Sequence, residues 1–270
     1  MTASLHQAQA RADAADHQLA ATLAERSAAL LRALRASGGH DPDALRREGD
    51  RRSHDLLVSE LAAARPDDAV LSEEGADPAG RLAARRVWIV DPLDGTREFG
   101  EPPRVDWAVH VALVIDGFPV VGAVALPALD EVWSTVPGPA PALRPAAPAP
   151  RLAVSRTRPG WSADLLRQEL GAELVPLGSA GFKALAVVRG AADVYAHSGG
   201  QYEWDSAAPV AVALAHGLHA SRLDGSPLVY NNASPYLPDL LIAHPAWAPS
   251  VLRAVAGGQP QPTVRPADRT

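Results

Sequence analysis

The chain has 270 residues, of which 47% are hydrophobic and 21% are charged, as is ordinary for a globular protein with a sizeable core. Its formal net charge is −6 and it has no cysteine, which excludes disulfides, thiolate nucleophiles and cysteine-type zinc sites. Basic residues do not alternate with aromatics, so a nucleic-acid polymer is not an expected partner. No leader-like apolar segment begins the sequence and no run of about 18 apolar residues occurs, so we expect a cytoplasmic protein without a membrane span.

Two helices are predicted at the start of the chain. Four leucines recur at helical spacing before a Ser-Gly-Gly sequence that is typical of a helix end: Leu19, Leu23, Leu30 and Leu34. A second helix is predicted to start near Asp50 and to end before Pro66.

Short apolar runs then predict strands. The segments 69–71 and 87–90 are typical of buried strands, and the stretch from Trp107 to Val132 is typical of a β-meander with Asp116-Gly117 as its tight turn. His110, within this meander, is interpreted as a core or edge residue.

The segment 136–150 contains six prolines and is predicted to be a connector. Beyond it, strands and helices are expected to alternate, as in an α/β fold: strand Leu152–Ser155, helix Ser162–Leu170, strand Leu174–Leu177, helix Phe182–Arg189, strand Asp193–Ala196 and helix Ser206–His216. The chain is therefore predicted to form two subdomains, 1–140 and 150–270, that share one interface.

The segment from Asp91 to Phe99 carries the clearest chemical signal. A buried strand leads into Asp91-Pro92-Leu93-Asp94, and the turn imposed by Pro92 can direct both carboxylates and the Leu93 carbonyl at one point. Gly95 permits close approach of a ligand, and the N–H groups of Gly95 and Thr96 suit a phosphate at a helix start. Carboxylates for a hard cation beside amides for phosphate are the parts that metal-assisted phosphate hydrolysis needs.

A structural interpretation of the same segment is also open. Asp91 and Asp94 can form an Asx-turn and a helix cap, because Asp-Gly is a common turn signal. A calcium EF-hand is excluded, since Val90 would occupy the first ligand position.

Two other acidic clusters follow the same pattern. Glu73 stands at the end of a predicted strand, and Asp205 precedes a predicted helix, where it is also a favoured N-cap residue. Glu74 and Glu98 are interpreted as solvated surface charges.

Together these residues resemble the inositol monophosphatase superfamily of lithium-sensitive, magnesium-dependent phosphatases. The family's three segments occur in order: Ser72-Glu73-Glu74, Trp88-Ile89-Val90-Asp91-Pro92-Leu93-Asp94-Gly95-Thr96, and Trp204-Asp205 before a helix. The resemblance runs from about residue 50 to residue 231 and implies an α-β-α-β-α sandwich, usually dimeric.

The resemblance also implies a role for each matching residue. Glu73, Asp91 and the Leu93 carbonyl would hold one Mg²⁺, and Asp91, Asp94 and Asp205 a second, with a third, weaker ion near Glu73. Asp50, which precedes Glu73 by 23 residues, would orient the attacking water together with Thr96. The sequence before Asp50 departs from the family pattern, since Glu48-Gly49 replaces its usual lead-in.

Smaller signals point to one branch of the family. The Thr96-Arg97-Glu98-Phe99 ending resembles 3′(2′),5′-bisphosphate nucleotidases of the CysQ type, and the segment 178–183 resembles their nucleotide-approaching segment. The implied substrate-binding residues are Gly95, Thr96, Arg97, Ser179 and Lys183. Lys183, the only lysine, could pair with a second phosphate, although a solvated helix position is an open alternative.

The implied activity is removal of the 3′-phosphate of adenosine 3′,5′-bisphosphate (PAP), and of its sulfated analogue PAPS, in sulfur assimilation. Two rivals stay open. One is a phosphatase of the same fold that acts on inositol 1-phosphate or fructose 1,6-bisphosphate. The other is a non-catalytic phosphate-ligand binder, which loss of a metal carboxylate would favour.

Overall fold

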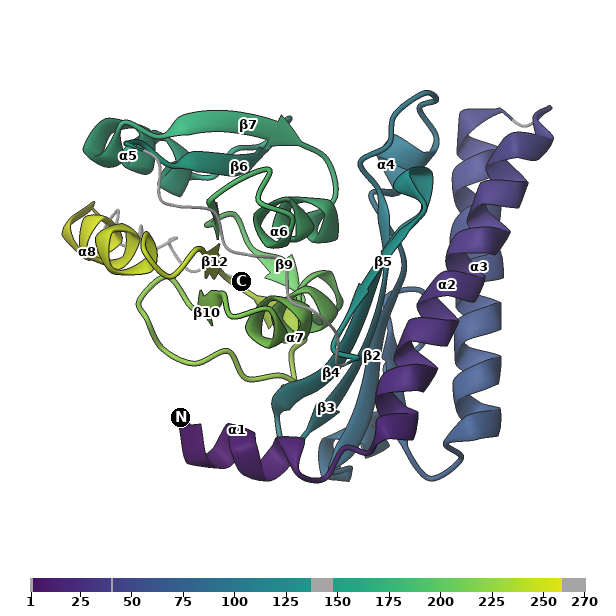
Figure 1. The fold of residues 1–270 in the computed structure, drawn as a ribbon. Coiled ribbons are helices and arrows are strands. Elements are labelled where there is room, and N and C mark those ends of the chain that lie inside the picture. The colour runs from purple at the N-terminus through teal and green to yellow at the C-terminus, as the bar shows by residue number, and fades with distance from the viewer. Residues whose placement is uncertain (1, 40, 137–147, 259–270) are drawn as a thin grey trace, which may run out of the picture.

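A computed structural model describes residues 2–39, 41–136 and 148–258 of the chain. These residues form five layers in the order helices, sheet, helices, sheet, helices (Figure 1). The layered α-β-α-β-α sandwich that the family resemblance implied is therefore confirmed. Within the described ranges, no helix combines the length and the apolar character needed to cross a membrane.

The first layer consists of two long helices, α2 (Ala14–Ser37) and α3 (Pro42–Ala64), after the short helix α1 (Thr2–Gln9). Helix α2 ends before Gly38, as predicted. Helix α3 begins well before the predicted start near Asp50, because the Asp41 side chain accepts hydrogen bonds from the first turn and Pro42 fits its first position. The prediction for this boundary was wrong, and the consequence is that Asp50 lies inside a helix.

The first sheet packs against these helices (Figure 1). Its strand order is β1-β2-β3-β4-β5. The strands are β1 (Ala69–Ser72), β2 (Arg86–Asp94), β3 (Ala108–Ile115), β4 (Phe118–Leu126) and β5 (Glu131–Ser134). Strand β1 is parallel to β2 and the remaining pairs are antiparallel, which confirms the predicted meander and its Asp116-Gly117 turn.

The second sheet has the order β10-β12-β8-β6-β7 and takes all its strands from residues beyond 150. The strands are β6 (Arg151–Ser155), β7 (Glu173–Leu177), β8 (Val194–His197), β10 (His219–Ser221) and β12 (Leu240–Ala243), and a separate ribbon pairs β9 (Gln201–Tyr202) with β11 (Tyr236–Leu237). Strand β6 is parallel to both β7 and β8, as expected of an α/β half.

Helices α6 (Ala180–Val188) and α7 (Ala207–Ala215) lie between the two sheets, whereas α5 (Trp161–Leu170) and α8 (Ala248–Gly258) cover the outer face of the second (Figure 1). Helices α6 and α7 carry small and branched apolar residues that are buried with residues of both sheets in one hydrophobic cluster. Three short 3₁₀ helices complete the described elements: Ala79–Ala83, Pro127–Leu129 and Glu203–Asp205.

The alternating elements predicted after residue 150 are confirmed, with small differences at their ends. The two sheets take their strands from either side of the proline-rich segment, and the division into subdomains 1–140 and 150–270 stays a prediction. Most of the predicted connector 136–150 lies outside the described residues.

Candidate active site

The end of strand β2 shapes the Asp91–Asp94 turn. Pairing with β3 shifts register between Asp91 and Asp94, so the strand bulges where its two aspartates stand. Asp91 Oδ1 accepts a hydrogen bond of 3.0 Å from the Leu93 N–H. Gly95 follows with φ = 86°, a left-handed conformation that favours glycine, and the short helix α4 (Thr96–Phe99) begins directly after it.

Three carboxylates from distant parts of the chain meet at this turn. Oxygen atoms of Asp91, Asp94 and Asp205 all lie within 4.8 Å of one another. Asp91 and Asp94 are buried. Asp205 is half-buried and its carboxylate accepts a hydrogen bond of 2.6 Å from the Tyr202 N–H. It lies in the 3₁₀ turn before α7, whose N-cap is Ser206, so the N-cap role considered for Asp205 was wrong.

Glu73 approaches the same turn from β1, the parallel neighbour of β2. Its N–H donates to the Val90 carbonyl at 3.3 Å, which continues the pairing beyond the end of β1. Its carboxyl group is close enough to the Asp91 carboxyl group for each to influence the pKa of the other. The exposed Glu73 thus lies beside the cluster of Asp91, Asp94 and Asp205 but outside the group whose oxygens lie within 4.8 Å of one another.

Desolvation and neighbouring negative charges raise the pKa of three of these acids. Burial, followed by the charges of Glu73, Asp94 and Asp205, raises the pKa of Asp91 well above its usual range. Desolvation by the surrounding groups raises the pKa of Glu73 to about 7, although this residue is exposed, and burial raises that of Asp205 to about 6. Repulsion from neighbouring carboxylates adds to both shifts. Such a cluster binds protons at neutral pH unless a cation supplies the missing positive charge.

Asp94 behaves differently because donors surround it. Burial alone would raise its pKa, but the hydrogen bond and charge of His110, with Lys183 and Ser179, lower it to about 2. The His110 Nε2 atom lies 3.2 Å from Asp94 Oδ2. The Ser179 hydroxyl and the Gly181 N–H donate to Asp94 Oδ2 at 2.5 and 2.6 Å, and the Ala180 N–H donates to Oδ1 at 3.0 Å. Asp94 therefore stays ionised and joins the first sheet to the start of α6.

The donor set fits a hard divalent cation. Asp91 Oδ2 is buried and has no hydrogen-bond partner in the described part of the chain. A buried carboxylate oxygen without a donor is costly, and several carboxylates converging on it are the ligands that Mg²⁺ and Ca²⁺ prefer. The nitrogen and sulfur ligands typical of structural zinc are not part of this set.

A second pair of polar groups, Asp50 and Thr96, lies beside the turn. The Thr96 hydroxyl is 3.3 Å from Asp50 Oδ1 and 3.0 Å from the Leu93 carbonyl oxygen. Burial, together with the charge of Glu74, raises the pKa of Asp50 to about 7, although the Thr96 hydrogen bond opposes this. A carboxylate with that pKa is suited to exchange a proton at neutral pH.

A cavity of about 510 Å³ opens beside the carboxylates. All five predicted substrate-binding residues line it, together with the metal-ligand candidates Asp94 and Asp205: Gly95, Thr96, Arg97, Ser179 and Lys183. The Lys183 ammonium group is buried and donates to the carbonyls of Ser179 at 2.5 Å and Gly178 at 3.4 Å. Burial lowers its pKa, and a solvated position is excluded. The roles given to these residues stay predictions.

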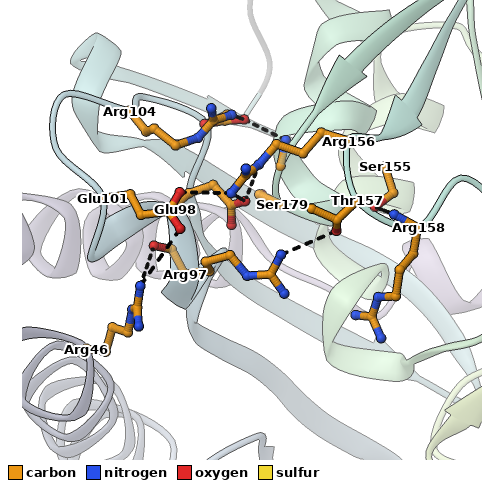
Figure 2. Close-up of polar contacts among 12 residues, drawn as sticks. Arg46, Arg97, Glu98, Glu101, Arg104, Ser155, Arg156, Thr157, Arg158 and Ser179 are labelled. Carbon is orange, nitrogen blue, oxygen red and sulfur yellow. Dashed lines mark hydrogen bonds and ion pairs between the residues drawn. The ribbon is translucent and has the colours of Figure 1, made fainter. Parts of the chain in front are cut away.

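One sequence interpretation near the site was wrong. Glu98 is not a solvated surface charge: it is 6% exposed and pairs with Arg156 at 2.7 Å (Figure 2). The interpretation of His110 as a core residue is confirmed, and its ring also contacts Asp94.

Sequence reasoning missed the partners of the predicted residues. His110 is opposite Asp91 in the pairing of β2 with β3, a register that the sequence could not supply. The Asp106 carboxylate accepts the Gly178 N–H at 2.6 Å, which fixes the segment before Ser179. An aspartate two residues before the apolar strand β3 was the only available signal for that contact.

Comparison with known proteins agrees with this geometry. The Inositol monophosphatase family profile matches residues 8–256. The chain is 52% identical over 237 residues to the 3′-phosphoadenosine 5′-phosphate phosphatase of Mycobacterium tuberculosis, covering 84% of this chain and 88% of that one. It is 33% identical to the 3′(2′),5′-bisphosphate nucleotidase CysQ of Escherichia coli, covering 68% and 79%. The crystal structure of CysQ from Bacteroides thetaiotaomicron superposes with a TM-score of 0.71 at 25% identity, covering 85% and 97%.

The chain therefore belongs to the inositol monophosphatase family, a metal-dependent family. Its sequence relatives include phosphatases named for nucleotides that carry two phosphates.

Proposed function

We propose that the protein is a magnesium-dependent phosphomonoesterase that hydrolyses the 3′-phosphate of PAP to give AMP and phosphate, and that it also accepts PAPS. Its place would be in sulfur assimilation and nucleotide recycling. The names of the mycobacterial and Escherichia coli relatives support this substrate. The structural observation that carries the proposal is one cavity that combines the acidic residues Asp94 and Asp205 with the cationic Arg97 and the aromatic Tyr202.

The carboxylate cluster would hold two to three Mg²⁺ ions. Glu73, Asp91 and the Leu93 carbonyl would provide one set of ligands, and Asp91, Asp94 and Asp205 the second, with a third ion near Glu73. The orphaned Asp91 Oδ2 supports a bridging role for Asp91. Bound ions of this kind lower the pKa of water and neutralise negative charge on a transferring phosphoryl group and its leaving oxygen.

Asp50 and Thr96 would manage the proton of the attacking water. The Thr96 hydroxyl can donate to the Leu93 carbonyl, which leaves its oxygen lone pairs available to orient that water. Asp50, whose pKa is about 7, would accept the proton. General base catalysis of this type contributes about 10²–10⁴-fold to a rate.

The start of α6 would keep Asp94 in place during turnover. The Ser179 hydroxyl and two backbone N–H groups hold its carboxylate, and Lys183 adds a nearby positive charge. Because such donors are already in position, the site has no reorganisation energy to supply when charge develops on the substrate.

The proposal includes a homodimer in the cytoplasm, for which the support is the family resemblance together with a cysteine-free sequence. Size-exclusion chromatography with light scattering tests the dimer.

A substrate panel tests the activity. With Mg²⁺ present, we expect PAP to have the highest kcat/KM among PAP, inositol 1-phosphate and fructose 1,6-bisphosphate. If PAP ranks last, the nucleotidase proposal fails, and the best substrate identifies the correct branch. Inhibition by Li⁺ at millimolar concentration or below is expected from the family resemblance.

A pair of variants tests catalysis against simple ligand binding. Loss of a residue that only contacts a metal ligand costs up to about 100-fold in activity. Because Asp94 is itself a proposed ligand, Asp94→Asn should lower kcat/KM by more than this. Asp50→Asn leaves the proposed metal ligands intact, and its kcat/KM should fall by about 10²–10⁴-fold. Phosphate release at the wild-type rate by folded Asp94→Asn protein would instead favour a non-catalytic binder.

A further inference from the structure

A buried carboxylate lies two residues before Asp205 and holds a distant loop of the chain. Glu203 begins the 3₁₀ turn that ends at Asp205, and it is 1% exposed. Its Oε2 atom accepts a hydrogen bond of 2.7 Å from the Asn231 N–H. Its Oε1 atom accepts from the Asn232 N–H at 2.9 Å and from the Asn232 side-chain amide at 2.7 Å. Both carboxylate oxygens of Glu203 therefore hold the loop 229–232.

The same loop contacts the chain on the other side of Asp205. Ser206 follows Asp205 directly, and its hydroxyl oxygen lies 3.2 Å from that of Tyr230, with both groups buried. The Glu203 N–H donates to the Pro235 carbonyl at 2.8 Å. Contacts before and after Asp205 thus fix the backbone of its turn. Because the turn has only three residues, a shift of Glu203 also displaces Asp205.

A buried arginine holds this loop as well. Arg81 lies in the 3₁₀ helix after β1 and is 1% exposed. Its Nη1 atom donates to the Asn231 side-chain oxygen at 2.8 Å and to the Asn232 carbonyl at 2.9 Å. The Asn231 side-chain amide donates back to the Arg81 carbonyl at 2.9 Å. Nε and Nη2 donate to the Asp77 carboxylate at 2.5 and 2.9 Å, which fixes the direction of the guanidinium group.

Asn231 joins the two buried charges. Its φ is 63°, in the left-handed region that asparagine adopts more readily than most residues. In this conformation its N–H meets Glu203 while its side chain meets Arg81. Hydrogen bonding to Asp77 and, to a smaller extent, the charge of Glu203 raise the pKa of Arg81, although burial opposes this. The two ends of the network are therefore linked by charge as well as by hydrogen bonds.

The network connects the segments that carry the two proposed metal ligands outside β2. Arg81 belongs to the segment that follows Glu73, and Glu203 precedes Asp205. Asp205 comes from the second half of the chain, so its place beside the two aspartates of β2 depends on how its turn is held. Residues that hold a metal ligand in place typically affect metal affinity by about 10–100-fold.

We propose that Glu203 and Arg81 are positioning residues that hold Asp205 at the proposed metal site through the loop 229–232. This inference rests on the proposed function, because it concerns the divalent ions that this function requires. Neither side chain is among the residues that line the cavity beside the carboxylates, so neither acts as a catalytic residue. Weakening the network lowers the affinity for divalent ions without removing a ligand.

Binding of Mn²⁺ to the metal-free protein tests the role of Glu203. Glu203→Gln keeps the size of the side chain but replaces one acceptor oxygen by an NH₂ group, which faces N–H donors. The variant should bind Mn²⁺ about 10–100-fold more weakly than the wild type in calorimetry. Phosphate release from PAP should then need more Mg²⁺, and excess Mg²⁺ should restore most of the wild-type kcat.

Asp193→Asn is the matched control for lost stability. Asp193 is 6% exposed, lies in the same half of the chain and also accepts three N–H groups, all from Arg151. Thermal unfolding should show a similar fall of Tm in both variants, by roughly 5–10 °C for the loss of buried hydrogen bonds to a charged group. Only Glu203→Gln should weaken Mn²⁺ binding, because Asp193 does not hold the turn of Asp205.

Two further variants test the network itself. Arg81→Met should weaken Mn²⁺ binding in the same direction as Glu203→Gln. The double variant should lose less than the product of the two single losses, because both changes act through the same loop. Asn232→Ala is a milder change at an exposed residue that removes one donor to Glu203. It should weaken Mn²⁺ binding by a smaller factor, and it keeps the test decisive should Glu203→Gln fail to fold.

Hydrogen exchange of the metal-free protein gives a readout that involves neither metal nor activity. The Tyr202 N–H donates to the Asp205 carboxylate and reports on the turn. It should exchange faster in Glu203→Gln than in the wild type or in Asp193→Asn.

The outcomes separate the positioning role from the proposed function. If the wild type binds Mn²⁺ and the folded variants of Glu203 and Asn232 bind it equally tightly, the positioning role is wrong and the proposed function stands. The role is also wrong if Asp193→Asn weakens Mn²⁺ binding as much as Glu203→Gln does. If the wild type binds no Mn²⁺, the proposed metal-dependent function fails and the positioning role fails with it.

Discussion

The Nε2 atom of His110 lies 3.2 Å from a carboxylate oxygen of Asp94, and both groups are buried. The Nδ1 atom of the same ring lies 2.9 Å from the Trp204 carbonyl oxygen. The Nδ1 atom is thus hydrogen-bonded, whereas Nε2 lies within ion-pair distance of Asp94 without hydrogen-bond geometry. Burial lowers the pKa of His110, but the close contact and charge of Asp94 raise it overall. The raised pKa of His110 favours its imidazolium form beneath the carboxylates.

Replacing His110 tests this relationship. In His110→Gln the positive charge is lost, the pKa of Asp94 should rise, and Mg²⁺ binding should weaken by about 10–100-fold, as for other partners of metal ligands. The measurement is turnover against Mg²⁺ concentration, in which excess Mg²⁺ should restore part of the activity. His6→Gln, an exposed change on α1, is the control. An unaltered Mg²⁺ dependence in His110→Gln would show that the contact has no role in the site.

Gly181 is required by the close approach of α6 to His110. A Cβ atom at this position would lie 2.0 Å from His110 Nε2, inside a buried contact that cannot yield. Gly181→Ala should therefore displace the start of α6, weaken the N–H contact to Asp94 and cost about 1–3 kcal/mol of stability, with most activity lost. Gly257→Ala is the control, because no atom lies within 4 Å of its added Cβ. Thermal unfolding and turnover measure both effects, and full activity in Gly181→Ala would refute the packing argument.

Metal binding should release protons near neutral pH. The pKa of Glu73 is about 7 and that of Asp205 about 6, so the metal-free cluster is partly protonated below pH 7. Cations bind the ionised form, which means that adding Mg²⁺ expels these protons and that affinity falls as the pH drops. Titration of Mg²⁺ into metal-free protein in weak buffer should release more protons at pH 6 than at pH 9. Equal release at both values would show that the carboxylates are already ionised.

Asp16 should stabilise the first layer of helices. It is 1% exposed and accepts hydrogen bonds of 2.9 Å from both Arg65 and Arg86. Burial opposes its ionisation, but the hydrogen bond from Arg86 and further contacts lower its pKa below the usual value. A lowered pKa in the folded state gives stability that is complete above the unfolded pKa near 4 and is lost as the pH falls through the folded value.

Asp16→Asn should therefore lower the free energy of unfolding at pH 7 by roughly 2–4 kcal/mol, somewhat less than breaking a fully buried ion pair costs. The difference in stability between the variant and the wild type should shrink below about pH 4. Urea unfolding across this pH range is the measurement. Asp130→Asn, which breaks an exposed ion pair with Arg32, should change stability by less than about 1 kcal/mol. A loss at pH 7 no larger than this control would contradict the role of Asp16.

The sequence predicted the elements of this fold well because their signals are local. Alternating apolar runs, the Asp116-Gly117 turn and the residues that end α2 each act over a few positions. The start of α3 was missed because Asp41 and Pro42 are its only markers and the segment after them is polar.

The four carboxylates were found because a family pattern joins segments that are far apart in sequence. The residues that contact these carboxylates were not predicted from the sequence. Contacts such as His110 with Asp94, or Asp106 with Gly178, depend on strand register and on how the two sheets pack. Glu98 shows the same limit: its partner Arg156 lies 58 residues away.

Diffraction from crystals soaked in Mn²⁺, a stand-in for Mg²⁺ with an anomalous signal, tests the metal site most directly. We expect anomalous peaks bounded by Asp91, Asp94 and Asp205, with Glu73 beside them. Well-ordered crystals at saturating Mn²⁺ with no peak among these carboxylates, or with peaks only elsewhere, would contradict the proposed metal-dependent chemistry.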